Sequence, residues 1–158
     1  PMLPVSLSIA QLPAQDAQAI AHYILDLKKT SSDAKPPPCA PEPRRTEKAL
    51  LGASLFDGAC ASCHGSAAPM RAIEARPALA NTSAVTADSP RNLIQTIVQG
   101  IPMSTAAPSH YMPAFADSLD DAQVAAIAEY LRNESCGNRP WTDLDKTIKS
   151  IRAQEQQP

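Results

Sequence analysis

Apolar residues recur three and four positions apart in four stretches of the chain, the spacing that places them on one face of a helix. No stretch shows the strict alternation of a half-buried strand. The pattern therefore predicts an all-α protein, in which the apolar faces of the second and the fourth helical stretch are directed into a core. The four faces consist of Ala17, Ile20, Ala21, Ile24 and Leu27; Ala49, Leu50, Leu55, Phe56 and Ala59; Leu93, Ile94, Ile97 and Val98; and Val124, Ile127, Ala128 and Leu131.

Capping residues mark the ends of these predicted helices. Thr46 can N-cap a helix that runs to about residue 58, and Asp120 opens the last long helix with a capping box. Ser89-Pro90 is a typical helix start, and Gly100 is the stop for that helix. Residues 65–81 and 101–115 lack periodicity and are expected to be loops. A further short helix is expected from about residue 143 to 152, with Trp141 packed on the domain.

The first predicted helix repeats the last one at a constant offset of 107 residues. The matched pairs are Leu12 and Leu119, Ala19 and Ala126, Ile20 and Ile127, Ala21 and Ala128, and Tyr23 and Tyr130. Either residues 1–29 are the tail of a preceding copy of the same domain, or they are an extra helix without chemistry. Residues 30–45 are a Pro-rich linker, 46–133 the main domain, and 134–158 a C-terminal extension.

Composition narrows the class of protein. The net charge of −2 argues against a nucleic-acid partner, because such partners call for a concentrated basic surface. No apolar run reaches the roughly 18–20 residues that span a bilayer. The first residues lack the features of a signal peptide, and a chain that starts with Pro is expected to be a piece of something longer.

The pentapeptide Cys60-Ala61-Ser62-Cys63-His64 carries the chemistry. Two thiols three residues apart lie on one side of a helical turn, where both can form thioethers with one porphyrin, and the adjacent histidine can ligate its iron. A redox-active thiol pair would need a preceding strand, and a zinc site would need two more ligands. The pentapeptide therefore predicts one covalently bound haem c, held by Cys60 and Cys63 with His64 as proximal ligand.

The sixth ligand of the iron decides between functions. Met112 is the best candidate, because Pro113 fixes the backbone beside its thioether and a soft sulfur suits an electron carrier. Met103, His110 and an open site remain alternatives. The second ring nitrogen of His64 is expected to donate to a backbone carbonyl, for which Pro77 is the candidate.

Two further cysteines, Cys39 and Cys136, lie outside the pentapeptide. Haem attachment of this kind takes place in an oxidising compartment, where a structural disulfide can persist. The sequence leaves open whether these two thiols form a bridge or stay free.

These motifs together resemble class I cytochrome c over residues 46–133. The resemblance rests on Cys60 to Gly65, Pro77 to Leu79, Met112 to Phe115 and Leu119 to Leu131. Residues 81–87 and 141–145 are similar, more narrowly, to multihaem cytochrome subunits of periplasmic dehydrogenases, including alcohol and gluconate dehydrogenases and molybdenum hydroxylases of the nicotinate and aldehyde type. Such subunits usually carry three haem domains in series, whereas this chain has one attachment motif.

The resemblance implies an electron-transfer domain that performs no catalysis itself. It implies a periplasmic location, where any association with the membrane would be through partners. The implied partners are a dehydrogenase catalytic subunit, a downstream acceptor such as quinone, oxidase or another cytochrome, and preceding haem domains. The alternative is a peroxidase-like haem enzyme or gas sensor with an exchangeable sixth ligand.

Overall fold

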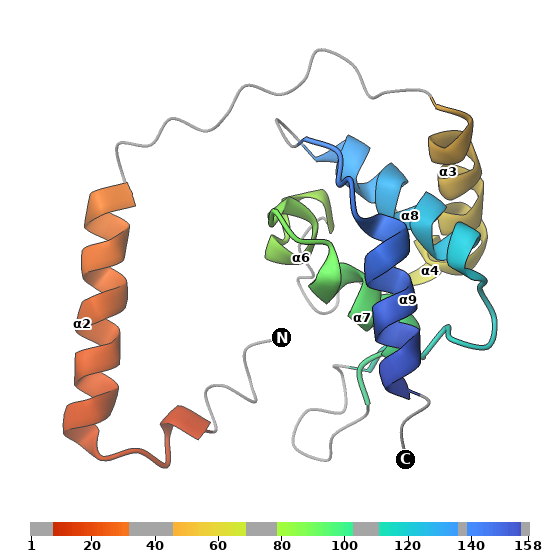
Figure 1. Cartoon of the computed structure of the whole chain (residues 1–158). Coiled ribbons are helices and arrows are strands. Elements are labelled where there is room, and N and C mark those ends of the chain that lie inside the picture. Colours follow the sequence, from red (N-terminus) through yellow and green to blue (C-terminus); the bar gives the residue numbers. More distant parts are fainter. Residues whose placement is uncertain (1–7, 32–45, 69–78, 103–110, 136–138, 156–158) are drawn as a thin grey trace. The chain divides into compact units, whose positions relative to one another are not determined.

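The computed structural model describes residues 8–31, 46–68, 79–102, 111–135 and 139–155, which fall into two compact units (Figure 1). Among these residues there is no named strand, and an isolated antiparallel bridge joins Ile101 to Met112. The predicted all-α class is confirmed. The helices are α2 (Ala14–Ser31), α3 (Glu47–Ala59), α4 (Ala61–His64), the 3₁₀ helix η1 (Leu79–Asn81), α6 (Ser83–Thr86), α7 (Arg91–Gln99), α8 (Asp121–Glu134) and α9 (Leu144–Glu155).

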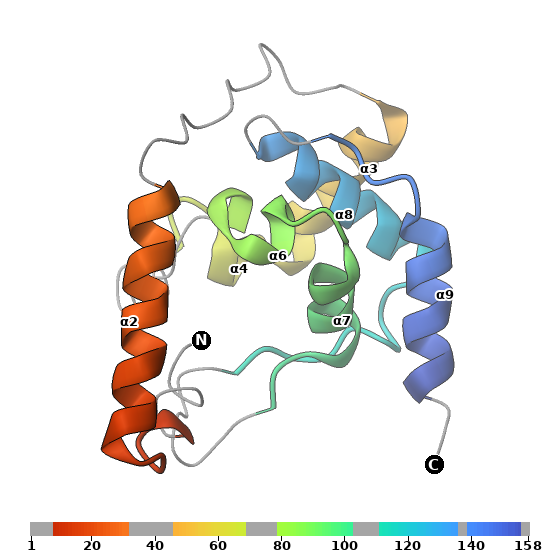
Figure 2. The same ribbon diagram turned by 60° about the vertical axis from the view of Figure 1, so that its left-hand side comes forward.

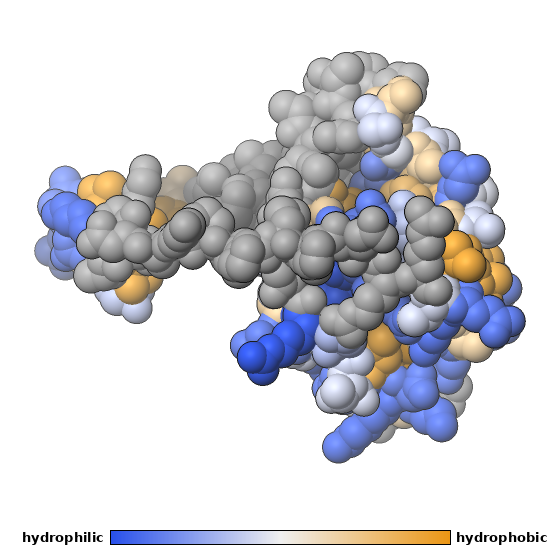
Figure 3. All heavy atoms as spheres, turned by 90° about the horizontal axis from the view of Figure 1, so that it is seen from above, coloured by the Kyte–Doolittle hydropathy of each residue, from blue (hydrophilic) through white to orange (hydrophobic). Residues whose placement is uncertain are grey.

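The first unit consists, in its described part, of α2 and the residues just before it. The polar residues 30–33 are predicted to end this helix, and it ends among them, at Ser31. No glycine or proline occurs between Pro13 and Pro36, so no backbone restriction stops it earlier. Its apolar side chains lie largely at the surface, where Figure 3 shows orange groups beside blue ones on this part of the chain.

The second unit is built on the crossing of α3 and α8, which lie side by side in Figures 1 and 2. A Cβ atom on Gly52 would lie 2.0 Å from the carbonyl oxygen of Ala126, so the two backbones are in direct contact there. The rings of Phe56 and Tyr130 pack beside this point, with centroids 5.4 Å apart. A side chain on residue 52 would therefore push the helices apart.

Thr46 caps α3 as the sequence predicts, and its hydroxyl accepts a hydrogen bond from the N–H of Ala49 at 3.0 Å. The same hydroxyl donates to Glu129 of α8 at 2.6 Å. The expected burial of Leu50 is wrong, because 57% of this residue is exposed. The close contact at Gly52 turns the face with Ala49 and Gly52 toward α8, and this orientation leaves Leu50 on the outside.

The stripe on α7 and the inner face of α8 form the core, as predicted. All four residues of each set are buried: Leu93, Ile94, Ile97 and Val98 on α7, and Val124, Ile127, Ala128 and Leu131 on α8. Asp120 forms the predicted capping box with Gln123. Residues 65–81 were expected to be a loop, but Leu79–Asn81 form η1, and α6 follows directly. Buried Val85 fixes α6 on the core.

The C-terminal extension packs into the same core. Trp141 is buried as predicted, and Leu144, Ile148 and Ile151 of α9 join the apolar cluster of α7 and α8. Figure 1 shows α9 running alongside this pair of helices. The extension is thus part of the compact unit that contains the pentapeptide.

The guanidinium of Arg132 ties the extension to the rest of this core. It lies 4.4 Å from the centre of the Trp141 ring and donates to the carbonyls of Val85, Ala87 and Arg139. Three carbonyl acceptors satisfy a charge that would otherwise be costly to bury. The side chain of Arg132 in α8 therefore fixes this helix both to the end of α6 and to the start of the extension.

Candidate functional site

Cys60 to His64 form one compact turn directly after α3. The N–H of Cys60 bonds to the carbonyl of Phe56 at 2.9 Å and so closes α3. The Cys60 carbonyl accepts from the N–H groups of both Cys63, at 3.1 Å, and His64, at 2.8 Å. The backbone thus brings both thiols and the imidazole into the single turn that the spacing predicts.

The two thiols are partly buried and are not joined to each other as a disulfide. Burial, and to a smaller extent the neighbouring Cys63, raises the pKa of the Cys60 thiol. Two unbridged thiols and an imidazole on one turn fit the donor set of a c-type haem. The chemistry of the residues present is therefore compatible with that cofactor.

Gly65 is a site residue whose role the sequence reasoning missed. A Cβ atom there would lie 2.6 Å from the carbonyl oxygen of Ala61, too close for a backbone contact. The N–H of Gly65 donates to that same carbonyl at 2.9 Å. A glycine after the histidine therefore lets the chain leave the turn tightly, and the only signal for it in the sequence is its place next to His64.

Met112 lies on a separate segment that follows α7 in the chain. It exchanges two hydrogen bonds with Ile101, N–H to carbonyl, at 3.0 and 2.9 Å. Gly100 makes this approach possible: its φ is +69°, and a Cβ atom on it would lie 2.5 Å from the Met112 carbonyl oxygen. The backbone of Met112 is therefore fixed by the glycine that ends α7.

Several predicted site residues lie outside the described residues. They are Pro77, the expected acceptor for His64; Met103 and His110, the alternative sixth ligands; and Cys39 and Cys136, the candidate disulfide partners. Their roles stay predictions. Within the ranges that the structure describes, no group of three or more His, Cys, Asp and Glu side chains gathers in a way that could hold a metal ion.

Comparison with known proteins decides the family. Residues 47–131, from the start of α3 almost to the end of α8, match the family described as "Cytochrome C oxidase, cbb3-type, subunit III". This chain belongs to the cbb3-type cytochrome c family. The predicted resemblance to class I cytochrome c is therefore confirmed, as is electron transfer, the kind of function that the resemblance implies.

Three relatives of this cytochrome are named as subunits of dehydrogenases or of an oxidase. The chain is 36% identical to a nicotinate dehydrogenase subunit of Pseudomonas putida over 97% of its own length, but over only 13% of that protein. It is 33% identical to the fructose dehydrogenase cytochrome subunit of Gluconobacter japonicus over 67% of its length and 23% of the relative's. It is 32% identical to the cbb3-type cytochrome c oxidase subunit CcoP of Azospirillum brasilense, covering 72% of the chain and 34% of the relative. No solved structure matches it.

The cytochrome therefore spans about an eighth to a third of the curated relatives it matches. The comparison with the nicotinate dehydrogenase subunit extends over nearly the whole chain and so includes α2 as well as the domain that follows. Within the described part of the cytochrome, no helix combines the length and the apolar character needed to cross a membrane.

Proposed function

We propose that this cytochrome transfers electrons through one haem c that is attached to Cys60 and Cys63, with His64 and Met112 as the axial ligands. The observation that carries the proposal is the single turn that presents both thiols and the imidazole directly after α3. When bound, a haem c supplies an iron that alternates between the ferric and ferrous states without making or breaking substrate bonds. We infer that the chain is a carrier and not an enzyme.

The residues of the chain have distinct roles in this proposal. The thiols of Cys60 and Cys63 anchor the porphyrin, and the His64 ring is oriented by a bond from its second nitrogen, for which the Pro77 carbonyl is our candidate. The thioether of Met112 favours the ferrous state and raises the potential. Its backbone is held by two hydrogen bonds to Ile101, which Gly100 lets approach, and this would limit the movement of the sulfur between the two oxidation states.

The axial ligand is tested by spectroscopy of the haem-loaded chain. Thioether ligation of ferric haem gives a near-infrared charge-transfer band, which Met112→Ala should abolish. Met103→Ala is the matched control, and we expect it to keep the band. If Met112→Ala keeps the band and Met103→Ala loses it, the assignment is wrong. A high-spin ferric spectrum in the unaltered chain would instead favour a peroxidase-like or gas-sensing site.

The number of haems and their attachment are tested by the intact mass. One covalent haem is expected on the full chain, and Cys60→Ser together with Cys63→Ser should leave none after denaturation. A mass without haem from a host that matures c-type cytochromes would refute the proposed attachment.

We also propose the domain boundaries 1–29, 30–45, 46–133 and 134–158, with the first segment as the tail of a preceding haem domain. The offset of 107 that relates the sequence repeat also relates Ala14 to Asp121, the first residues of α2 and α8. The face that α8 buries is open on α2: Ile127 is 1% exposed, whereas its counterpart Ile20 is 40% exposed. A helix that plays the part of α3 would cover that face in the preceding domain.

The proposed partners follow from the named relatives. We infer that the cytochrome belongs to the electron-transfer component of an exported, periplasmic dehydrogenase and passes electrons to a quinone, an oxidase or another cytochrome. Two of the three relatives are dehydrogenase subunits by name, and this supports the inference. The intact mass of the native polypeptide tests whether haem domains precede α2, since a second covalent haem is expected in that case.

A further inference from the structure

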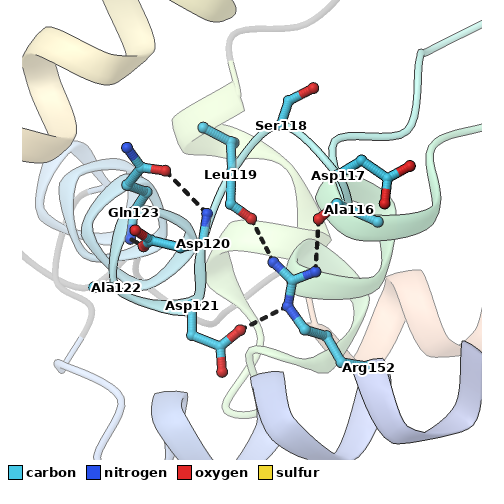
Figure 4. A pocket seen from close by; sticks show the side chains of 9 residues that line it. All are labelled: Ala116, Asp117, Ser118, Leu119, Asp120, Asp121, Ala122, Gln123 and Arg152. Atoms are coloured by element: carbon cyan, nitrogen blue, oxygen red, sulfur yellow. Dashed lines mark hydrogen bonds and ion pairs between the residues drawn. The ribbon is translucent and has the colours of Figure 1, made fainter. Parts of the chain in front are cut away.

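Arg152, near the end of α9, lies outside the part of the chain that matches the family. Its three guanidinium nitrogens all bind the segment that leads from Met112 into α8. One donates to the carbonyl of Ala116 at 2.8 Å, one to that of Leu119 at 2.5 Å, and the third pairs with Asp121 at 2.6 Å. Figure 4 shows the guanidinium pointing into this turn, which lines a surface pocket.

The same segment is held from α7 through its N–H groups. Phe115 donates to the carbonyl of Ile97 at 3.1 Å, and Ala116 donates to that of Val98 at 3.2 Å. The segment after Met112 is thus fixed twice: its N–H groups donate to carbonyls of α7, and its carbonyls accept from Arg152 of α9. Ala116 follows Met112 by four residues, so the contacts of Arg152 act on the same stretch of backbone that carries the methionine.

Arg152 is itself held firmly in place. Ile148 and Ile151 on the same helix are fully buried in the core, and the side chain of Arg152 is 22% exposed. Hydrogen bonds from a charged donor are roughly twice as strong as neutral ones, and a planar guanidinium can serve several acceptors at fixed angles. A lysine carries its donors on a single nitrogen and so cannot reproduce contacts that Arg152 makes through three different nitrogens.

We propose that Arg152 is a positioning residue for the axial thioether: it restrains the segment after Met112 and so keeps the sulfur on the iron. The proposal rests on the proposed function, in which Met112 is the sixth ligand. The C-terminal extension then has a role in the redox site, in addition to its role in the core.

The test is competition for the iron in the ferric, haem-loaded full chain. Imidazole is titrated at fixed pH, and its apparent Kd is read from the loss of the near-infrared band. In Arg152→Gln the loss of the charged donor should strengthen imidazole binding by about tenfold, because the segment after Met112 is then held by α7 and Ile101 alone and the sulfur competes less well. Arg152→Lys should lie between Arg152→Gln and the unaltered chain.

Two control variants separate positioning from general loosening of α9. Arg91→Gln removes another link to α9, the 2.9 Å bond from Arg91 to Gln154, but leaves the Met112 segment untouched. Ile148→Val weakens the packing of α9 in the core without removing a polar contact. Both should leave the imidazole Kd within about twofold of the unaltered chain, because Arg91→Gln alters only a surface contact and Ile148→Val removes no polar contact to the Met112 segment.

The outcomes distinguish this inference from the proposed function. If Met112→Ala keeps the band, the ligand assignment fails and the positioning role fails with it. If Met112→Ala loses the band but Arg152→Gln binds imidazole no more tightly than Arg91→Gln, the positioning role alone is refuted. Should Arg152→Gln fail to take up haem, Arg152→Lys is decisive, and an unchanged imidazole Kd in that variant overturns the proposal.

Discussion

Gly52→Ala perturbs the contact between α3 and α8 at its closest point. The added Cβ atom would lie 2.0 Å from the carbonyl oxygen of Ala126 and 2.9 Å from the Cβ of Tyr130. Carbon and carbonyl oxygen ordinarily approach to about 3.3 Å, so the helices must separate by about 1.3 Å. The Cβ atom has a fixed position on its backbone and the atom that it meets is a backbone carbonyl oxygen, so no side-chain rotation can relieve the contact.

The expected cost follows from known effects of overpacking. Extra methyl groups in a packed core cost about 1–3 kcal/mol, and we expect the upper end here because the clash is with backbone. Replacing a helical glycine by alanine returns about 0.5–1 kcal/mol, so the net loss should be about 2 kcal/mol. Against a total stability of about 5–15 kcal/mol, this loss is large.

Gly58→Ala is the matched control for this experiment. Gly58 lies in the same helix, and a Cβ atom on it would have nothing within 4 Å. This variant should gain about 0.5–1 kcal/mol from the helix propensity alone. Urea unfolding of the haem-loaded chain, followed by far-ultraviolet circular dichroism, gives both values. If the two variants have the same free energy of unfolding, α3 and α8 do not cross at Gly52.

Two further predictions concern Gly100 and Tyr130. Gly100→Ala should cost about 1–3 kcal/mol and weaken the near-infrared band, because only glycine readily adopts its backbone angles and the new Cβ atom would clash with Met112; an intact band would refute this. Burial, aided by Glu134 and Asp57, raises the pKa of Tyr130 above its ordinary 10.0. The unfolded chain therefore loses this proton first, so the free energy of unfolding should fall as pH rises above about 10, and less steeply in Tyr130→Phe. Equal slopes in urea titrations of the two proteins would contradict the shift.

Local signals in the sequence predicted most of the domain. Thr46 and Asp120 cap their helices with hydroxyl and carboxylate oxygens, and these interactions span only three residues. The stripe on α7 is buried because four apolar residues on one face leave no other stable arrangement. The turn from Cys60 to His64 is likewise set by bonds within five residues. Predictions of this kind need no knowledge of distant partners.

Contacts between distant residues could not be predicted. Leu50 has the spacing of a core residue, but the backbone contact between Gly52 and Ala126, which lie far apart in the chain, turns it outward. The acceptors of Arg132 lie in α6, directly after it and in the C-terminal extension, and those of Arg152 lie just before α8 and at its first residue. An arginine with a buried guanidinium has the same sequence pattern as a solvated one.

Electron transfer favours a coordination that stays the same in both oxidation states, and the proposed ligation by Met112 would give a role to the contacts that converge on one segment. The residues from Met112 to Asp120 contain no regular helix or strand, yet Ile101, α7 and Arg152 each bind their backbone. Loops whose backbone groups lack hydrogen bonds are mobile, whereas each of these hydrogen bonds restricts the motion of the segment. The family match ends at residue 131, but the helix that supplies Arg152 begins at Leu144. With Arg152 in the proposed positioning role, the redox unit of this chain would extend to α9, and a polypeptide truncated after α8 should hold its thioether less firmly.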